Sequence, residues 1–219
     1  MTIFALDIET DTSPLTEAEK AAGFTARGLD PRITPVTAVA MHAGGNSHVL
    51  HADDSADGEP ALLEQVGAFM IGAGANRNSG GVLVTWNGSV FDLPFLADRA
   101  RILGVLDYWY AGLDLTPDPS FAPKYDPLPG HDGGYRATWC GLPHIDIAYV
   151  DKDECLAAGV SWSLKPWAKH LGMDPVEVDR SRMHELTREE LDAYVASDAR
   201  ITHDLAVRHG YRLIERAGL

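Results

Sequence analysis

Basic residues and cysteines are scarce in this chain of 219 residues. The 18 Lys and Arg stand against 32 Asp and Glu, so the formal net charge is 18 − 32 = −14. A protein that coats nucleic acid relies on a broad Lys/Arg surface, and this balance excludes that class. Two cysteines, Cys140 and Cys155, are too few for a disulfide scaffold and favour a reducing, cytoplasmic location.

Long apolar runs are also missing. No stretch approaches the roughly 20 apolar residues of a membrane span, and the chain starts directly on a strand-like segment, so we expect neither a membrane partner nor a leader. The 45% of hydrophobic residues are too many for a disordered chain. The length suits one well-cored domain, and we predict a single domain over residues 1–219.

The apolar pattern predicts an α/β fold. Strands are expected at 3–8, 36–42, 48–51, 82–86 and 144–150, and helices at 14–23, 60–71 and 92–103. Thr187 and Glu190 form a capping box that begins a long helix, which we expect to end near Arg216. This order of elements predicts a mixed central sheet of about five strands with helices on both faces.

The pattern breaks down at about 107–140, where proline, glycine and aromatic residues are frequent. We interpret this stretch as an insertion into the domain, because a loop of that length in a compact domain is functional or mobile. Its aromatic side chains either stack on the bases of a single strand or close as an apolar lid over the core.

Two segments at strand ends carry acidic residues. Asp7 and Glu9 flank Ile8 at the end of the first strand, and residues two apart in a strand project from the same face. Asp92 begins a helix directly after the fourth predicted strand, in the sequence Asn87-Gly-Ser-Val-Phe-Asp. An aspartate that merely caps this helix is the alternative interpretation.

The terminal helix adds a third acidic position. Tyr194 and Asp198 are four residues apart and share a helix face with Ile201 and Leu205, the face that must be buried. A buried aspartate is costly unless it is paired or binds a metal. Four carboxylates can hold two divalent metals, and Mg²⁺ or Mn²⁺ suits an all-oxygen site better than zinc does.

In this combination and order, the chain resembles the DEDD superfamily of 3′→5′ exonucleases, and most closely the proofreading domains of B-family DNA polymerases and their stand-alone relatives. The residues that match the three family motifs are Asp7-x-Glu9, Asn87-x3-Phe91-Asp92 and Tyr194-x3-Asp198. The tyrosine indicates the DEDDy branch, because Ala193 stands where the histidine branch has its histidine. A ribonuclease-H-like fold is implied.

The resemblance also implies roles for the matching residues. Asp7 would bridge two Mg²⁺ or Mn²⁺ ions, Glu9 and Asp198 would complete one metal site, and Asp92 would hold the other metal largely through water. Tyr194 would orient the attacking water. Asn87 and Phe91 would flank the 3′ end of the substrate, and the backbone near Ile8 and Thr10 would meet its terminal sugar.

The expected function is that of a metal-dependent 3′→5′ exonuclease that releases nucleoside 5′-monophosphates from single-stranded DNA ends. An exoribonuclease similar to the ribonuclease D group is one alternative, and a catalytically silent nucleic-acid-binding or assembly subunit is another. A polymerase domain does not fit in 219 residues, so proofreading would need a polymerase or another replication or repair partner. Arg99 and Lys165 are among the alternative phosphate contacts.

Overall fold

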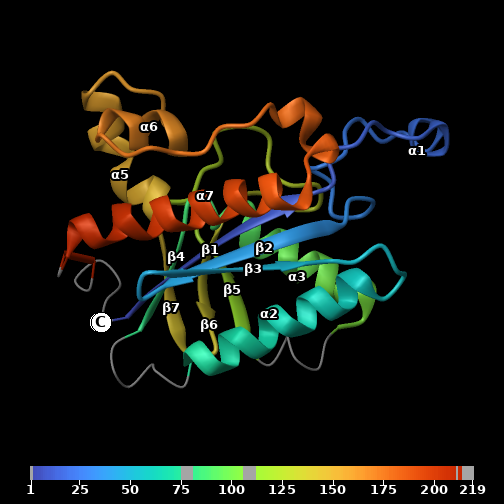
Figure 1. The fold of residues 1–219 in the computed structure, drawn as a ribbon, viewed down its shortest axis with the longest axis horizontal. Coiled ribbons are helices and arrows are strands. Elements are labelled where there is room, and N and C mark those ends of the chain that lie inside the picture. Colours follow the sequence, from blue (N-terminus) through green and yellow to red (C-terminus); the bar gives the residue numbers. More distant parts are fainter. Residues whose placement is uncertain (1, 75–80, 106–111, 211, 214–219) are drawn as a thin grey trace.

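The computed structural model describes residues 2–74, 81–105, 112–210 and 212–213. In this part of the chain, seven strands form one mixed sheet in the order β3-β2-β1-β4-β7-β6-β5 (Figure 1). β1, β4 and β7 run parallel to one another, and the remaining neighbours pair antiparallel. The strands are β1 (Ile3–Thr10), β2 (Val36–Ala43), β3 (Asn46–His51), β4 (Val82–Thr85), β5 (Leu113–Pro117), β6 (Tyr135–Trp139) and β7 (Leu142–Asp146).

Helices cover both faces of the sheet, as the sequence predicts. They are α1 (Glu17–Ala21), α2 (Gly58–Gly74), α3 (Asp92–Leu103), α5 (Ile147–Ala157), α6 (Leu164–His170) and α7 (Arg188–His209), with a 3-10 segment, η2 (Arg180–Glu185), before α7. The α/β fold class is therefore confirmed, with a sheet wider than the five strands expected. None of the helices in the described ranges is long and apolar enough to cross a bilayer.

The alternation of side chains along β1 separates two layers of core. Phe4, Leu6 and Ile8 pack with residues of α2 and α3 on one face, whereas Ile3 and Ala5 pack with residues of α5, α6 and α7 on the other. Because successive strand residues point to opposite faces, β1 directs its odd-numbered side chains toward α7. This periodicity decides which face receives the acidic residues.

α7 lies along β1 and β2 (Figure 1). Its predicted capping box is present: the Thr187 side chain accepts from the Glu190 N–H, and the Glu190 side chain accepts from the Thr187 N–H. The predicted end near Arg216 is wrong, because α7 ends at His209. There Gly210 adopts a φ of 53°, a left-handed conformation that glycine tolerates and that takes the backbone out of the helix.

The strand predicted at 144–150 is half wrong. β7 ends at Asp146, and α5 begins at the next residue. Asp146 is the N-cap of α5, and its carboxylate accepts a hydrogen bond from the Ala148 N–H at 3.1 Å. The apolar residues that follow look like a continuing strand, but this cap converts them into the first turn of a helix.

Two strands lie within the segment that we interpret as an insertion, 107–140. β5 and β6 pair antiparallel, with Leu113 opposite Trp139 at one end and Pro117 opposite Tyr135 at the other. β6 in turn pairs with β7 and so joins the sheet. Trp139 is fully buried in the core. Residues 107–111 of the segment lie outside the described ranges, and the single-domain organisation stays a prediction.

Candidate active site

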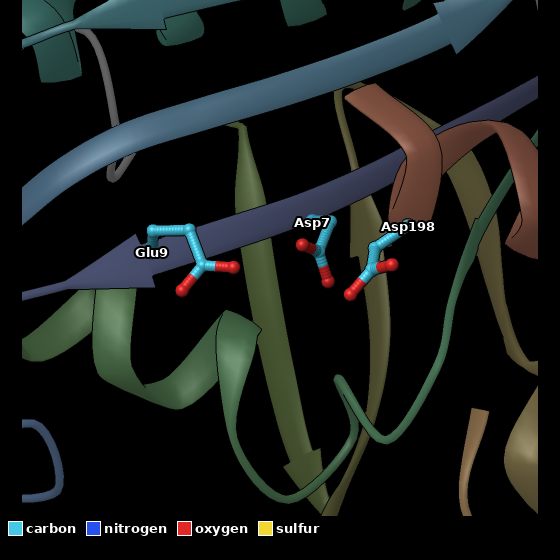
Figure 2. Close-up of side chains that lie close together, drawn as sticks. All are labelled: Asp7, Glu9 and Asp198. Atoms are coloured by element: carbon cyan, nitrogen blue, oxygen red, sulfur yellow. The ribbon is translucent and has the colours of Figure 1, made fainter. Parts of the chain in front are cut away.

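β1 and α7 bring three acidic side chains together. One carboxylate oxygen from each of Asp7, Glu9 and Asp198 lies within 4.8 Å of the other two. Figure 2 shows the three side chains extending to the same side of β1. Asp7 and Glu9 are half-buried, and Asp198 is 3% exposed. The alternation of side chains along β1 and the buried face of α7 thus bring these three carboxylates to one place.

The crowding of negative charge changes the acidity of these groups. Burial raises the pKa of Asp7 well above its usual value, and the carboxylates of Asp198, Glu9 and Asp92 raise it further. Burial and the nearby Asp198 raise the pKa of Glu9 to about 8. Burial also raises the pKa of Asp198 to about 6, although the Lys165 ammonium opposes this shift. Without cations, Glu9 keeps its proton at neutral pH, because its pKa lies above that pH.

Asp92 faces the same site from a different element. It is the first residue of α3 and is 4% exposed, and its Oδ1 accepts a hydrogen bond from the Ile8 N–H at 3.3 Å. Burial raises the pKa of Asp92 to about 7. Its carboxylate is not one of the three whose oxygens meet within 4.8 Å, so it lies beside the cluster rather than in it.

The cluster has the donor chemistry of a site for hard divalent cations. All three side chains offer oxygen, which Mg²⁺ and Mn²⁺ prefer, and neither histidine nor cysteine joins the group in the described part of the chain. Asp198 Oδ1 is buried, and the Lys165 ammonium lies 3.2 Å from it. Three carboxylate ligands that meet this closely suit a hard divalent cation, so the residues fit a divalent metal.

Tyr194 and Lys165 form the wall of the site next to Asp198. Lys165 Nζ lies 3.2 Å from Asp198 Oδ1 and 3.6 Å from the centroid of the Tyr194 ring, and it donates a hydrogen bond to the Val176 carbonyl at 2.6 Å. Tyr194 is buried, and burial together with the Glu9 and Asp198 carboxylates raises the pKa of its hydroxyl. Tyr194 therefore stays a neutral hydroxyl at physiological pH.

Arg180 is a site residue that sequence reasoning missed. Its guanidinium hydrogen-bonds the Tyr194 side chain and lies near the Asp198 and Glu9 carboxylates. Lys165 and Arg180 both line a pocket of about 430 Å³. Arg180 begins the 3-10 segment η2, which has no periodic pattern, and the sequence carries no signal that would place it here.

The loop between β4 and α3 is held by a second buried aspartate. Asp146 accepts hydrogen bonds from the N–H groups of Asn87 and Ser89, both at 2.8 Å. Asn87 has a φ of 73°, a left-handed conformation that asparagine tolerates better than most residues. Asn87 thus has a conformational role in the loop, and its predicted contact with the 3′ end stays a prediction. In the sequence, the signal that could have identified Asp146 as a functional residue was its position as the N-cap of α5.

The other predicted substrate contacts lie around the same loop and strand. Phe91 is half-buried, with its ring centroid 5.3 Å from that of Phe95. The Thr10 hydroxyl donates to the Gly28 carbonyl at 2.9 Å, and the Ile8 N–H already donates to Asp92. The predicted roles of Ile8, Thr10 and Phe91 toward a substrate stay predictions.

Arg99, an alternative phosphate contact, instead has a structural position. It is 7% exposed, its Nε donates to Glu59 Oε1 at 2.8 Å, and its NH1 donates to the Pro31 carbonyl at 2.9 Å. These partners satisfy the guanidinium inside the protein, so it is not available to a phosphate.

Comparison with known proteins identifies the relatives of this chain. No family model matches it. It is 29% identical over 137 residues to the catalytic subunit of DNA polymerase epsilon from Saccharomyces cerevisiae, and 30% identical over 138 residues to that from Eremothecium gossypii. The chain is a homologue of these polymerase subunits. The matches cover 61% of this chain but only 5% and 6% of the relatives, so the chain spans a small fraction of their length.

The fold has a counterpart among solved structures. The family B DNA polymerase from the archaeon Pyrobaculum calidifontis matches 98% of this chain with a TM-score of 0.67 and 22% sequence identity, over 25% of its own length. The predicted resemblance to B-family polymerases and the ribonuclease-H-like fold class are confirmed.

Proposed function

We propose that this protein is a metal-dependent 3′→5′ exonuclease that removes nucleoside 5′-monophosphates from single-stranded DNA ends. The observation that carries the proposal is the meeting of the Asp7, Glu9 and Asp198 carboxylates beside the buried Tyr194 hydroxyl. Polymerase homology supports DNA as the polymer, and it also supports a polymerase or another replication or repair protein as the partner that delivers the substrate.

In this proposal the carboxylates of Asp7, Glu9 and Asp198 hold the metals, and Asp92 contributes from the side of α3. Two divalent cations held there would supply a water of lowered pKa and would stabilise the charge on the attacking and leaving oxygens. Because the cations acidify the water, no protein group needs to act as a strong base.

The remaining residues position the reactants. The Tyr194 hydroxyl, neutral because its pKa is raised, orients the attacking water through a hydrogen bond. Arg180 restrains Tyr194 from the η2 side, and Lys165 presents a positive charge beside Asp198. The loop fixed by Asp146 holds Asn87 and Phe91 beside the terminal nucleotide.

The experiment is an incubation of 5′-labelled DNA and RNA oligonucleotides with Mg²⁺, Mn²⁺ or a chelator. We expect a ladder that shortens the DNA from its 3′ end, requires metal, and is lost in Asp7→Asn by at least about a hundredfold. Asp204→Asn is the matched control, because Asp204 lies on the same helix as Asp198 but pairs with Arg200 and His203.

Each outcome decides between the candidate functions. Degradation of RNA but not DNA would make the protein an exoribonuclease. Metal-independent cleavage, or equal activity in Asp7→Asn and the parent protein, would overturn the proposed site. No degradation of either polymer with any metal would leave a nucleic-acid-binding or assembly subunit.

A further inference from the structure

Four aromatic side chains form a surface next to the site, at the edge of the core against which Trp162 packs. We call this surface, made of Phe121, Tyr125, Tyr149 and Trp162, the aromatic ledge. The ring centroids of Phe121 and Tyr149 are 5.0 Å apart and those of Tyr149 and Trp162 are 5.1 Å apart, both edge to face. Tyr125 is 77% exposed, and the other three rings are half-buried.

Hydrogen bonds fix two of these rings by their polar ends. The Tyr149 hydroxyl donates to the Ala122 carbonyl at 2.8 Å, and Trp162 Nε1 donates to the Ala148 carbonyl at 2.7 Å. Both polar groups are thus satisfied inside the chain. The rings are preorganised, and binding a planar apolar group against them costs little side-chain entropy.

Lysines accompany the rings. Lys124 Nζ lies 5.4 Å from the centroid of Tyr125, and Lys152 Nζ lies 4.3 Å from that of Trp162. The chain has only five lysines. Two of them lie on this ledge and a third, Lys165, lines the adjoining pocket, so lysines are concentrated here. Rings interleaved with ammonium groups are the composition that binds single-stranded nucleic acid.

The aromatic ledge is continuous with the site at two places. Lys124 Nζ donates to the Trp162 carbonyl at 3.3 Å and to Ser163 Oγ at 3.5 Å, and Ser163 lines the same pocket as Lys165 and Arg180. The aromatic ledge therefore leads into the pocket beside Tyr194 and Asp198.

The second connection runs to the loop before α3. Phe121 and Val90 both pack against Gly134. A Cβ atom added at Gly134 would lie 2.5 Å from Phe121 Cβ and 2.6 Å from Val90 Cγ1. Val90 lies in the loop that carries Asn87 and Asp92. α5, which carries Tyr149 and Lys152, and α6, which follows Ser163, lie together at one end of α7 (Figure 1).

We propose that the aromatic ledge, with Lys124 and Lys152, binds the single strand behind the 3′ nucleotide. Its bases stack on the rings, and its phosphates pair with the two ammonium groups. The inference rests on the proposed function, because the direction of the strand follows from cleavage at its 3′ end. Trp139, in contrast, is fully buried in the core and takes no part.

The test measures binding of 5′-fluorescein oligo(dT) by fluorescence anisotropy, with full-length protein that carries Asp7→Asn and calcium in place of magnesium. We expect Tyr125→Ala to weaken binding of a strand of about 16 nucleotides roughly tenfold. Binding of a strand of about 4 nucleotides should weaken by a smaller factor. Tyr125→Phe keeps the ring and should restore the affinity. Because Tyr125 is exposed, its substitution leaves the core intact.

Lys152→Ala supplies an independent measurement. Loss of one phosphate contact should reduce the slope of log K against log salt by about 0.7 for a single strand. Lys20→Ala is the matched control, because Lys20 is an exposed lysine of α1 that pairs with Glu17. Tyr125→Ala and Lys152→Ala proteins that bind the long strand as tightly as the parent would overturn the inference.

The inference and the proposed function can fail separately. If the substitutions do not change the degradation of long or short strands, the proposed function stands and the role of the aromatic ledge is refuted. If the protein cleaves neither polymer but both variants bind the long strand more weakly, the binding surface stands and the proposed function is refuted.

Discussion

Gly88 shows how one residue fixes the geometry of the loop beside the acidic cluster. A Cβ atom at this position would lie 2.2 Å from Thr85 Oγ1 and 2.6 Å from Thr85 Cβ. Thr85 cannot simply turn away, because its hydroxyl bonds His144 Nε2 at 2.7 Å and accepts from the Gly88 N–H at 3.1 Å. The structure therefore requires glycine at this position so that the backbone can approach Thr85 closely.

Gly88→Ala should therefore destabilise the protein by about 1–3 kcal/mol through overpacking, and should also lower nuclease activity by displacing the loop. Urea denaturation measures the first effect, and the oligonucleotide assay measures the second. Gly72→Ala is the control, because a Cβ there meets no atom within 4 Å on the exposed face of α2, and alanine is the better helix former. A Gly88→Ala protein as stable as the parent would contradict the packing argument.

At the residue scale, the sequence located the acids better than their partners. The sequence predicts that three acids lie together, because strand and helix periodicity indicate which side chains share a face. These acids are Asp7, Glu9 and Asp198. Arg180 could not, because it reaches Tyr194 from an irregular segment. A contact made by a long side chain across a loop depends on tertiary placement, which no local period encodes.

The two capping boxes allow a comparison between elements. Thr16 with Glu19 caps α1, and Thr187 with Glu190 caps α7, through the same pair of hydrogen bonds. α1 has five residues and buries none of them, whereas α7 buries nine, including Tyr194 and Asp198. Identical local chemistry therefore supports elements of very different importance to the core.

Thr187→Ala should lower the free energy of unfolding by about 1 kcal/mol, because the first turn of α7 loses its cap. Thr16→Ala should leave global unfolding unchanged, since α1 can fray without exposing the core. Urea denaturation of the two variants beside the parent protein measures both. Equal losses of stability in the two variants would show that α1 is coupled to the core.

At the element scale, the prediction failed where local patterns competed. The segment after His144 is apolar enough to continue a strand, but the cap at Asp146 starts α5 instead. β5 and β6 were missed because prolines and glycines surround them, and long-range pairing between Leu113 and Trp139 is invisible to a local pattern. The start of α7 was predicted well, because its capping box is a local signal. The start of α3 was predicted from the turn before it, and Asp92 is its first helical residue rather than its cap.

For the whole molecule, the acidic cluster links stability to pH. The pKa values of about 8 for Glu9, 7 for Asp92 and 6 for Asp198 lie above the value of about 4 for carboxyls of the unfolded chain. Between about pH 4 and pH 8, the folded protein thus binds more protons than the unfolded chain. Its metal-free stability is greatest at the acidic end of this range and falls as pH rises through the folded pKa values.

Thermal unfolding in a chelator should therefore show a lower Tm at about pH 8.5 than at about pH 5.5, by roughly 4–8 °C for a loss of about 2 kcal/mol. Millimolar Mg²⁺ or Mn²⁺ should raise Tm more at the higher pH, because fewer protons then compete for the carboxylates. Asp7→Asn removes a central carboxylate and should flatten both responses. A parent Tm that is independent of pH and metal would contradict the coupling.

The position of the acids along the chain has a consequence for biosynthesis. Asp7 lies in the first strand and Asp198 in the last helix, 198 − 7 = 191 positions apart, yet their oxygens meet. A ribosome delivers β1 long before α7, and contacts of such separation form late. A nascent chain, or one cut by a protease between α6 and α7, therefore carries no complete set of metal ligands. Under the proposed function, hydrolytic competence would appear only once α7 has docked on β1, and an unfinished molecule would not degrade DNA.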